Sequence, residues 1–182
     1  MSNDMIGMKC LIPLFVLFIF SISIALAEKD SVTTGPYNIS FDLGVLRDSY
    51  TVTVNPQKEG SGVKTYGVSI VNQTADALRK AGIGLSYYTV APPSNDWGET
   101  MKQVAHGLGL SNEAIETRAI DGTTGGFVSG NLDTKDNGSI KVYTAYYYSP
   151  IDTHLLVQVT SSYPWEGETS SLLNTIHVEK VK

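Results

Sequence analysis

The amino-acid sequence predicts an α+β domain, in which a single antiparallel β-sheet is flanked by two or three helices. The first observation is a recurring alternation of apolar and polar residues, with glycine, proline and aspartate turns between the alternating runs. The second is a change of period in residues 96–108 and 166–176, where apolar residues recur at helical spacing. No internal repeat or second core is visible, so residues 37–182 are predicted to form one domain after a short linker at 28–36.

Residues 1–27 have the pattern of a signal peptide. Lys9 precedes 18 uncharged residues, 10–27, which end in small side chains at Ala25 and Ala27. We predict cleavage after Ala27. The alternative is an uncleaved anchor formed by residues 10–27, because at about 1.5 Å per residue this run just crosses the hydrocarbon core of a bilayer. Both readings place the remaining chain outside the cytoplasm, either secreted or at the cell surface. The start codon is open between three methionines, Met1, Met5 and Met8.

Cysteine usage and charge narrow the classes of function. Cys10 is the only cysteine and lies in the predicted leader, so the mature chain would have no disulfide, thiolate nucleophile or thiolate metal ligand. The net charge is −5, and the lysines and arginines are dispersed rather than clustered. Nucleic acid is therefore not expected as a partner, because phosphates require a concentrated positive face.

The first strands follow from alternation with a period of two. Apolar residues alternate with polar ones in residues 37–43, 50–54 and 66–70, and the three runs are predicted to form an antiparallel meander. Residues 73–82 fit either a short helix or a polar connection and are left unassigned. Alternation then resumes at Ile83 and Leu85.

A helix is predicted after Pro92 and Pro93. Asp96 is in place to cap it, and Glu99 three residues later completes a capping box. Its apolar stripe is narrow, so the helix should cover one side of a sheet. The stripe consists of Trp97, Met101, Val104 and Leu108, and Gly107 and Gly109 supply the stop. More strands follow, then a second helix with Leu172, Leu173 and Ile176 at helical spacing, and a short final strand.

Two glycine-containing stretches are interpreted as turns. Residues 118–130 hold four glycines, but neither phosphate-loop spacing occurs and no helix follows, so Asp121-Gly122 is predicted to be a hairpin turn. Asp133, Asp136 and Asn137 could suggest part of a calcium loop. Lys135 stands where that loop needs Asp or Asn, and Thr144 stands where it needs Glu, so Asp136-Asn137-Gly138 is predicted to be a second hairpin turn.

No residue is assigned to catalysis, and no metal or cofactor is predicted. The three histidines, His106, His154 and His177, are not spaced as metal-binding pairs usually are. No G-x-S-x-G nucleophile elbow occurs. A non-enzymatic protein is therefore expected. A hydrolase that uses two exposed carboxylates stays open as a second alternative, because acidic residues far apart in the sequence can meet in one cleft.

Aromatic residues provide the first alternative function, a protein that binds a small ligand or a glycan. The candidate binding residues are Tyr143, Tyr146, Tyr147, Tyr148 and Trp165. Adjacent tyrosines on a strand point to opposite faces, so an outward set could stack on a sugar or a peptide. The competing interpretation is a strand packed under a helix.

Three N-glycosylation sequons are present, at Asn38, Asn72 and Asn137. Asn38 lies on the polar face of its predicted strand, and Asn137 lies in a predicted turn. Both should reach solvent, where an exported chain meets the glycosylation machinery. Chance occurrence of the sequons is the alternative.

The C-terminal half carries a family resemblance. The runs RAIDGTTGGFVSG, IKVYTAYYYSP and HLLVQVTSSYPWEGETSSLLNTIHVEK occur in that order. This order resembles the PsbP/Mog/DcrB-like fold and is similar to exported proteins of methanogenic archaea. The resemblance implies an antiparallel sheet flanked by helices and a non-catalytic interaction or assembly role, with an unknown protein or glycan as partner outside the cytoplasm. It transfers no functional residue.

Overall fold

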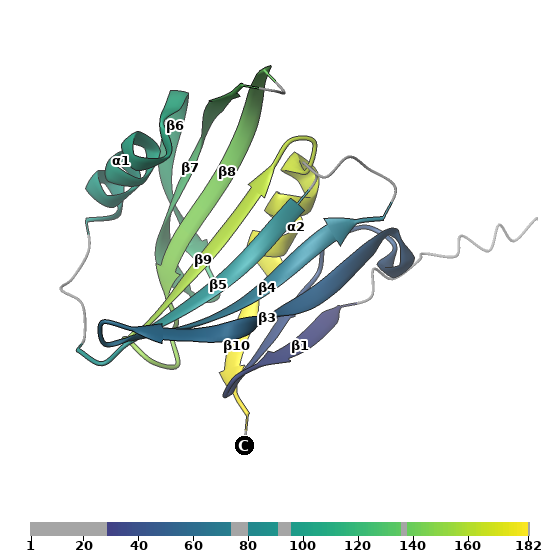
Figure 1. Cartoon of the computed structure of the whole chain (residues 1–182), viewed down its shortest axis with the longest axis vertical. Helices are drawn as coiled ribbons and strands as arrows, with labels where there is room; N and C mark the ends of the chain where they lie inside the picture. Colours follow the sequence, from purple (N-terminus) through teal and green to yellow (C-terminus); the bar gives the residue numbers. More distant parts are fainter. Residues whose placement is uncertain (1–28, 74–79, 91–95, 136–137, 182) are drawn as a thin grey trace, which may run out of the picture.

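The computed structural model describes residues 29–73, 80–90, 96–135 and 138–181 (Figure 1). These residues form mainly β-strands, with two α-helices and one short 3-10 turn. The elements in chain order are β1 (Asp30–Thr34), β2 (Tyr37–Phe41), η1 (Arg47–Ser49), β3 (Tyr50–Gly60), β4 (Val63–Asn72), β5 (Lys80–Tyr88), α1 (Trp97–Leu108), β6 (Leu110–Ile120), β7 (Thr123–Thr134), β8 (Gly138–Tyr148), β9 (Leu155–Ser162), α2 (Glu166–Thr175) and β10 (His177–Lys180).

The described strands form two antiparallel sheets rather than one. The large sheet has the order β3-β4-β5-β9-β8-β7-β6, and the small sheet has the order β1-β2-β10. The predicted fold class, a single sheet flanked by two or three helices, is therefore wrong. The strand around Ile39 forms as predicted, but it pairs with Val32 of β1 and Val178 of β10, not with β3. Alternation identifies such a strand but does not say which sheet it joins.

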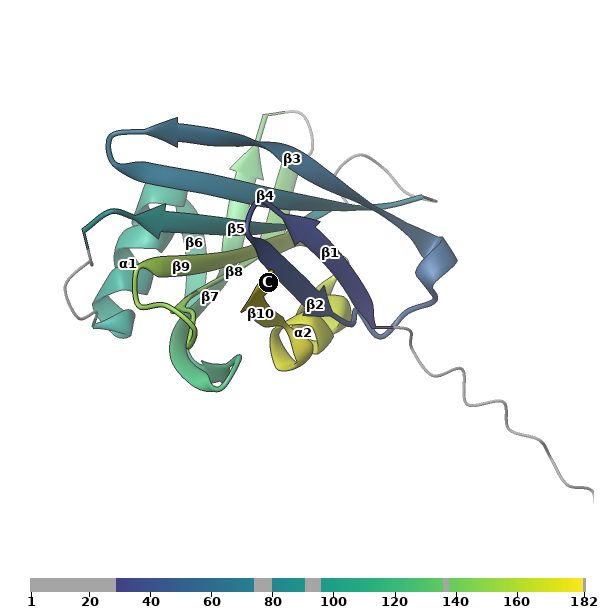
Figure 2. The same ribbon diagram turned by 90° about the horizontal axis from the view of Figure 1, so that it is seen from below.

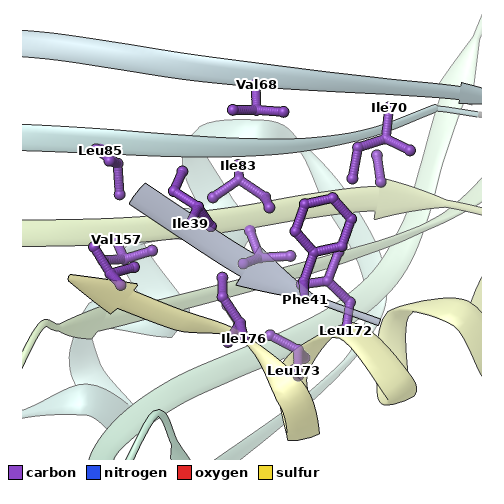
Figure 3. Close-up of a cluster of buried hydrophobic side chains, with 14 of the residues drawn as sticks. Ile39, Phe41, Val68, Ile70, Ile83, Leu85, Val157, Leu172, Leu173 and Ile176 are labelled. Atoms are coloured by element: carbon purple, nitrogen blue, oxygen red, sulfur yellow. The ribbon is translucent and has the colours of Figure 1, made fainter. Parts of the chain in front are cut away.

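The hydrophobic core lies between the two sheets. The small sheet and α2 cover one face of the large sheet, called the inner face here, and α1 lies against the opposite, outer face (Figure 2). Figure 3 shows Phe41 of β2 and Leu172 of α2 directed toward side chains of β4, β5 and β9. The labelled members of this core are Ile39, Phe41, Val68, Ile70, Ile83, Leu85, Val157, Leu172, Leu173 and Ile176.

Helix α1 forms where the capping pattern predicts it. Asp96 Oδ1 accepts a hydrogen bond from the backbone N–H of Glu99 at 3.1 Å, and Gly109 ends the helix with a φ of 69°. Met101 is fully buried against Val128 of the sheet. The helix therefore covers one side of a sheet, as expected. Leu108 does not join the buried face, because it is 43% exposed at the last turn.

The glycine run holds a turn and two sites of close packing. Asp121 and Gly122 have φ values of 50° and 74°, so the predicted hairpin turn is confirmed. Gly125 and Gly126 lie in β7. A Cβ at Gly125 would stand 2.8 Å from the Cβ of Tyr147, and one at Gly126 would stand 2.7 Å from the Cγ of Met101. These two positions bring neighbouring elements close to the sheet backbone.

The remaining predictions concern the leader, the sequon at Asn137 and the segments 28–36 and 73–82. The leader with Cys10 and its cleavage site Ala27, and the sequon residue Asn137, lie outside the described residues. Of the unassigned stretch 73–82, the structure describes Gln73 in a turn and the start of β5. Residues 28–36, expected to be a linker, contain β1. Neither α1 nor α2, the two α-helices within the described ranges, is long and apolar enough to cross a bilayer.

Candidate functional site

The five aromatic residues singled out from the sequence do not share one exposed surface. Tyr143, Tyr147 and Trp165 contribute to the interior and are 3%, 0% and 3% exposed. Tyr146 and Tyr148 point to the outer face instead, where Tyr146 packs beside α1 and Tyr148 lies 5.6 Å from the Trp97 ring. Burial raises the pKa of Tyr146 and of Tyr147, because their phenolate forms would lose hydration. The C-terminal part of β8, from Tyr143 to Tyr148, is thus covered on both faces.

The histidines lie apart from one another. His154 Nδ1 is 2.9 Å from the carbonyl oxygen of Tyr88. His177 Nδ1 is 2.7 Å from Asp121 Oδ1, near the turn between β6 and β7. His106 is exposed in the last turn of α1. Within the described ranges, no group of three or more His, Cys, Asp or Glu side chains is arranged to hold a metal ion.

Two of the three sequon asparagines are described. Asn38 lies in β2, where its Nδ2 donates to Glu179 Oε1 at 3.0 Å and its Oδ1 accepts from Ser31 Oγ at 3.0 Å. Asn72 is the last residue of β4 and is partly buried. A glycan on Asn38 would be attached to the same Nδ2 that donates to Glu179 of β10.

A groove crosses the outer face of the large sheet beside the C-terminal end of α1. It consists of two adjoining hollows of about 580 Å³ and about 270 Å³, which share Ser69, Gly82 and Thr160. We call this region the outer groove. Its larger end has an apolar wall formed by Leu108, Leu110, Leu132 and Val142. Its smaller end is lined by polar side chains that include Asn55, Ser69, Gln158 and Thr160.

Three glycines, Gly67, Gly82 and Gly84, contribute to the floor of the outer groove at its smaller end. Gly67 of β4 pairs with Gly84 of β5, and Gly82 pairs with Ser69 of β4 and with Thr160 of β9. Because Ile83 and Leu85 point into the core, the alternation of the strand turns positions 82 and 84 to the outer face. The large sheet therefore presents bare backbone at this point.

The packing of the chain itself does not require glycine at two of these positions. A Cβ added at Gly82 would meet nothing closer than the carbonyl oxygen of Val68 at 3.8 Å, and one at Gly84 would meet Gln158 Cβ at 3.8 Å. Both are ordinary contact distances, and neither glycine has a positive φ. Glycine inside a strand often marks a place where a ligand or another backbone approaches closely.

Uncharged groups make up the lining of the outer groove. The described residues around its two hollows are aliphatic, hydroxyl, amide or glycine, and none carries an ionised side chain. The lining of the outer groove therefore offers no counter-charge to a charged ligand. Shape, apolar contact at the α1 end and neutral hydrogen bonds at the other end are the interactions that it can make.

Sequence reasoning missed the outer groove, although part of its signal was present. In the run KAGIGLSYY, Gly82 and Gly84 occupy the positions that alternate with Ile83 and Leu85. Two glycines on the polar side of an otherwise regular strand indicate a bare outer face. That neither α1 nor α2, the α-helices of the described residues, covers these two glycines became visible only in the folded structure.

Comparison with known proteins gives no family for the chain. No protein-family model matches it, and no curated protein is similar to it at a significant level. The resemblance to the PsbP/Mog/DcrB-like fold and to exported archaeal proteins therefore stays a prediction.

Proposed function

We propose that the protein is an exported, non-catalytic interaction module that binds an extended, uncharged segment of a partner protein in the outer groove. The observation that carries this proposal is the bare strip at Gly82 and Gly84. A glycine in the middle of a strand costs about 0.5–1 kcal/mol relative to alanine. At these two positions the chain gains no internal packing in return, because a Cβ would fit.

An extended peptide segment suits the shape and chemistry of the groove. Without a Cβ on the floor, a partner backbone can approach the sheet closely. The larger hollow, where Leu108 is 43% exposed, can receive one apolar side chain of the partner. The amide and hydroxyl groups of Asn55, Gln158 and Thr160 can pair with the partner's backbone N–H and C=O groups.

The leader pattern of residues 9–27 supports export, and with it a partner outside the cytoplasm. A membrane attachment through residues 10–27 remains part of the proposal if the leader is not cleaved. The PsbP/Mog/DcrB-like resemblance of the C-terminal half supports a role in interaction or assembly rather than in catalysis.

A peptide library displayed on phage tests the proposal with the immobilised protein. We expect enrichment of peptides that lack charged residues in their central part and contain one large apolar residue. Binding should be lost in Gly84→Val, because the added side chain fills the floor of the groove. Gly60→Val is the matched control, since a Cβ at Gly60 meets nothing within 4 Å and this residue lies at the end of β3, outside the lining of both hollows.

Three binding patterns of the selected peptides can be distinguished. Peptides that bind the wild-type and Gly60→Val proteins but not Gly84→Val support the proposal. Peptides that bind all three proteins equally place recognition outside the groove and contradict it. Enrichment of strongly charged peptides also contradicts it, because the lining offers them no counter-charge.

A further inference from the structure

Four strands stand at the ends of the two described sheets, and three of them are protected against pairing with another chain. Strands β1 and β10 are only five and four residues long. Strand β6 carries charged side chains at Glu113, Glu116 and Arg118, and a bulge between Ser111 and Ala114 interrupts it. Short length, charge and bulges are the usual means by which proteins keep edge strands from pairing with one another. The edge strand that differs from these is β3 (Figure 1).

The first half of β3 has none of these protective features. Residues 50–55 contain no charged side chain, no proline and no bulge, and four of them are β-branched. Pro56 and a bulge follow directly after them. Val54 is 45% exposed, although its side chain lies on the inner face together with that of Val68, the residue opposite in β4. Among the described residues, this segment is therefore an open edge with high strand propensity.

The backbone groups of Val52 and Val54 point away from the sheet. The N–H of Gln73 donates to the carbonyl oxygen of Ser49 at 3.0 Å, so these opposite residues form a hydrogen-bonded pair where the β3–β4 ladder begins. In an antiparallel ladder, hydrogen-bonded pairs alternate with pairs that are not bonded. Thr53 therefore bonds to β4, whereas Val52 and Val54 direct their N–H and C=O groups to the outer edge.

We propose that two copies of the chain associate through this segment, as an antiparallel β3–β3 pair related by a two-fold axis at Thr53. Val52 of each copy lies opposite Val54 of the other, and both pairs exchange their backbone hydrogen bonds. A register shifted one way would need the carbonyl oxygen of Tyr50, which already accepts from Arg47 Nη1 at 3.0 Å. A register shifted the other way would need an N–H from Pro56, which has none.

The side chains that this pairing brings together are complementary. The valines cover one another on the inner face, and Thr53 meets its own copy on the outer face. Asp48 precedes Thr53 by five residues and Lys58 follows it by five, so the acid of one copy approaches the base of the other at both ends of the pair. Both charged side chains are exposed. Because the paired segment is short, the dimer should be weak, with a dissociation constant between micromolar and millimolar.

The dimer would also bring two outer grooves together. Asn55 and Ser69 line the polar end of each groove, and Thr53 lies opposite Ser69 in the ladder. A two-fold axis at Thr53 therefore places the two polar ends side by side. This consequence rests on the proposed function, whereas the dimer itself does not.

Disulfide trapping tests the pairing with the full-length chain in a Cys10→Ser background, where the introduced cysteine is the only one. Opposite residues of a non-bonded pair have Cα atoms about 4.5 Å apart, a distance that a disulfide spans. We expect Thr53→Cys to form a covalent dimer under mild oxidation. Thr51→Cys, which would lie opposite Asn55 of the second copy, should form at least tenfold less. Equal trapping of the two variants, or no trapping of Thr53→Cys, would overturn the proposal.

Sedimentation at increasing protein concentration separates dimerisation from a loss of folding. Val54→Pro removes an N–H that points outward, so it should abolish the dimer and keep β3 paired with β4. Val54→Thr keeps both the N–H and a branched side chain, and as the matched control it should dimerise like the wild type. A Val54→Pro protein that keeps the wild-type circular dichroism spectrum and still dimerises would contradict the proposal.

A charge exchange tests the register. Lys58→Asp should weaken the dimer roughly threefold, because the acid at each end of the pair then faces another acid. The double variant Asp48→Lys, Lys58→Asp should recover the wild-type dissociation constant. A double variant as weak as the single one would contradict the register. A chain that stays monomeric throughout would refute the dimer and leave the outer groove to be tested separately, since peptide binding there needs only one copy.

Discussion

Gly67 of β4 and Gly84 of β5 lie directly opposite each other in the antiparallel pair. Together with Gly82 they leave a strip of the outer face without side chains, next to the exposed Leu108 of α1. The opposite face of the same strands is packed with large aliphatic residues. The large sheet is therefore closed on its inner side and open on part of its outer side.

Gly82 and Gly84, where a Cβ would fit, should be replaceable by alanine without loss of stability. We expect Gly82→Ala and Gly84→Ala each to raise the free energy of unfolding by about 0.5–1 kcal/mol, because alanine loses less backbone entropy on folding. Urea denaturation measures the change. Gly126→Ala is the matched opposite case and should destabilise, since its Cβ would stand 2.7 Å from Met101 Cγ. Destabilisation by Gly84→Ala would mean that the chain itself needs this glycine.

The cap of α1 should contribute measurably to stability. Asp96→Ala removes the carboxylate that accepts the backbone N–H of Glu99 and should cost about 1 kcal/mol in the free energy of unfolding. Thermal denaturation of this variant can be compared with Glu113→Ala, which removes an exposed carboxylate on the edge strand β6. Equal melting temperatures for the two variants would contradict the capping role.

Asp121 should hold the last strand in place. Its carboxylate, 5% exposed, accepts the backbone N–H of Val178 at 3.1 Å and lies 2.7 Å from His177 Nδ1. Asp121→Ala leaves that N–H without its acceptor and also strains a residue with a φ of 50°, so a loss of about 1–3 kcal/mol is expected. Asp121→Asn keeps an acceptor and a side chain that tolerates this φ, so it should lose less.

Hydrogen exchange checks the local part of that prediction. In Asp121→Ala the Val178 amide should exchange faster relative to core amides such as that of Val157. An unchanged ratio would contradict the anchoring role.

Acid should weaken the ion pair between Asp152, in the turn after β8, and Lys180 of β10. The backbone N–H of His154 donates to Asp152 Oδ1 at 3.0 Å, and Lys180 lies 3.3 Å from Oδ2, so the pKa of Asp152 is lowered from its ordinary value of 3.8. A lowered folded-state pKa gives stability that is present above the ordinary value and is lost as the pH falls through the folded value. The melting temperature of the wild type should therefore exceed that of Asp152→Asn at pH 6, and the difference should shrink below pH 3.8. A difference that stays constant into acid would contradict this linkage.

Features that depend on neighbouring residues were predictable from the sequence. The cap at Asp96 and the turn at Asp121-Gly122 each follow from the chemistry of a few adjacent groups, and both form as expected. The partner of β2 was not predictable in the same way. Alternation at Tyr37, Ile39 and Phe41 fits a strand in either sheet, and the choice is made by β10 at the far end of the chain.

The candidate sites were less accessible to sequence reasoning than the fold. Crowded tyrosines suggested an exposed platform, but Tyr147 lies in the core because its large apolar body gains more from burial than from exposure. Arg118, Tyr143 and Glu166 line one small cleft under α2, although they come from three elements that are distant in the sequence. Only the folding of α2 over the sheet brings these residues together.

The outer groove is tested most directly by mapping a library-selected peptide on the protein with amide NMR shifts. Our account predicts that the largest changes occur at Ser69, Gly82, Gly84 and Thr160, with a smaller set at the end of α1 near Leu108. Changes confined to the outer edges of β3 or β6, the two end strands of the large sheet, would mean that the peptide adds a strand to the sheet, and would contradict recognition on the glycine floor.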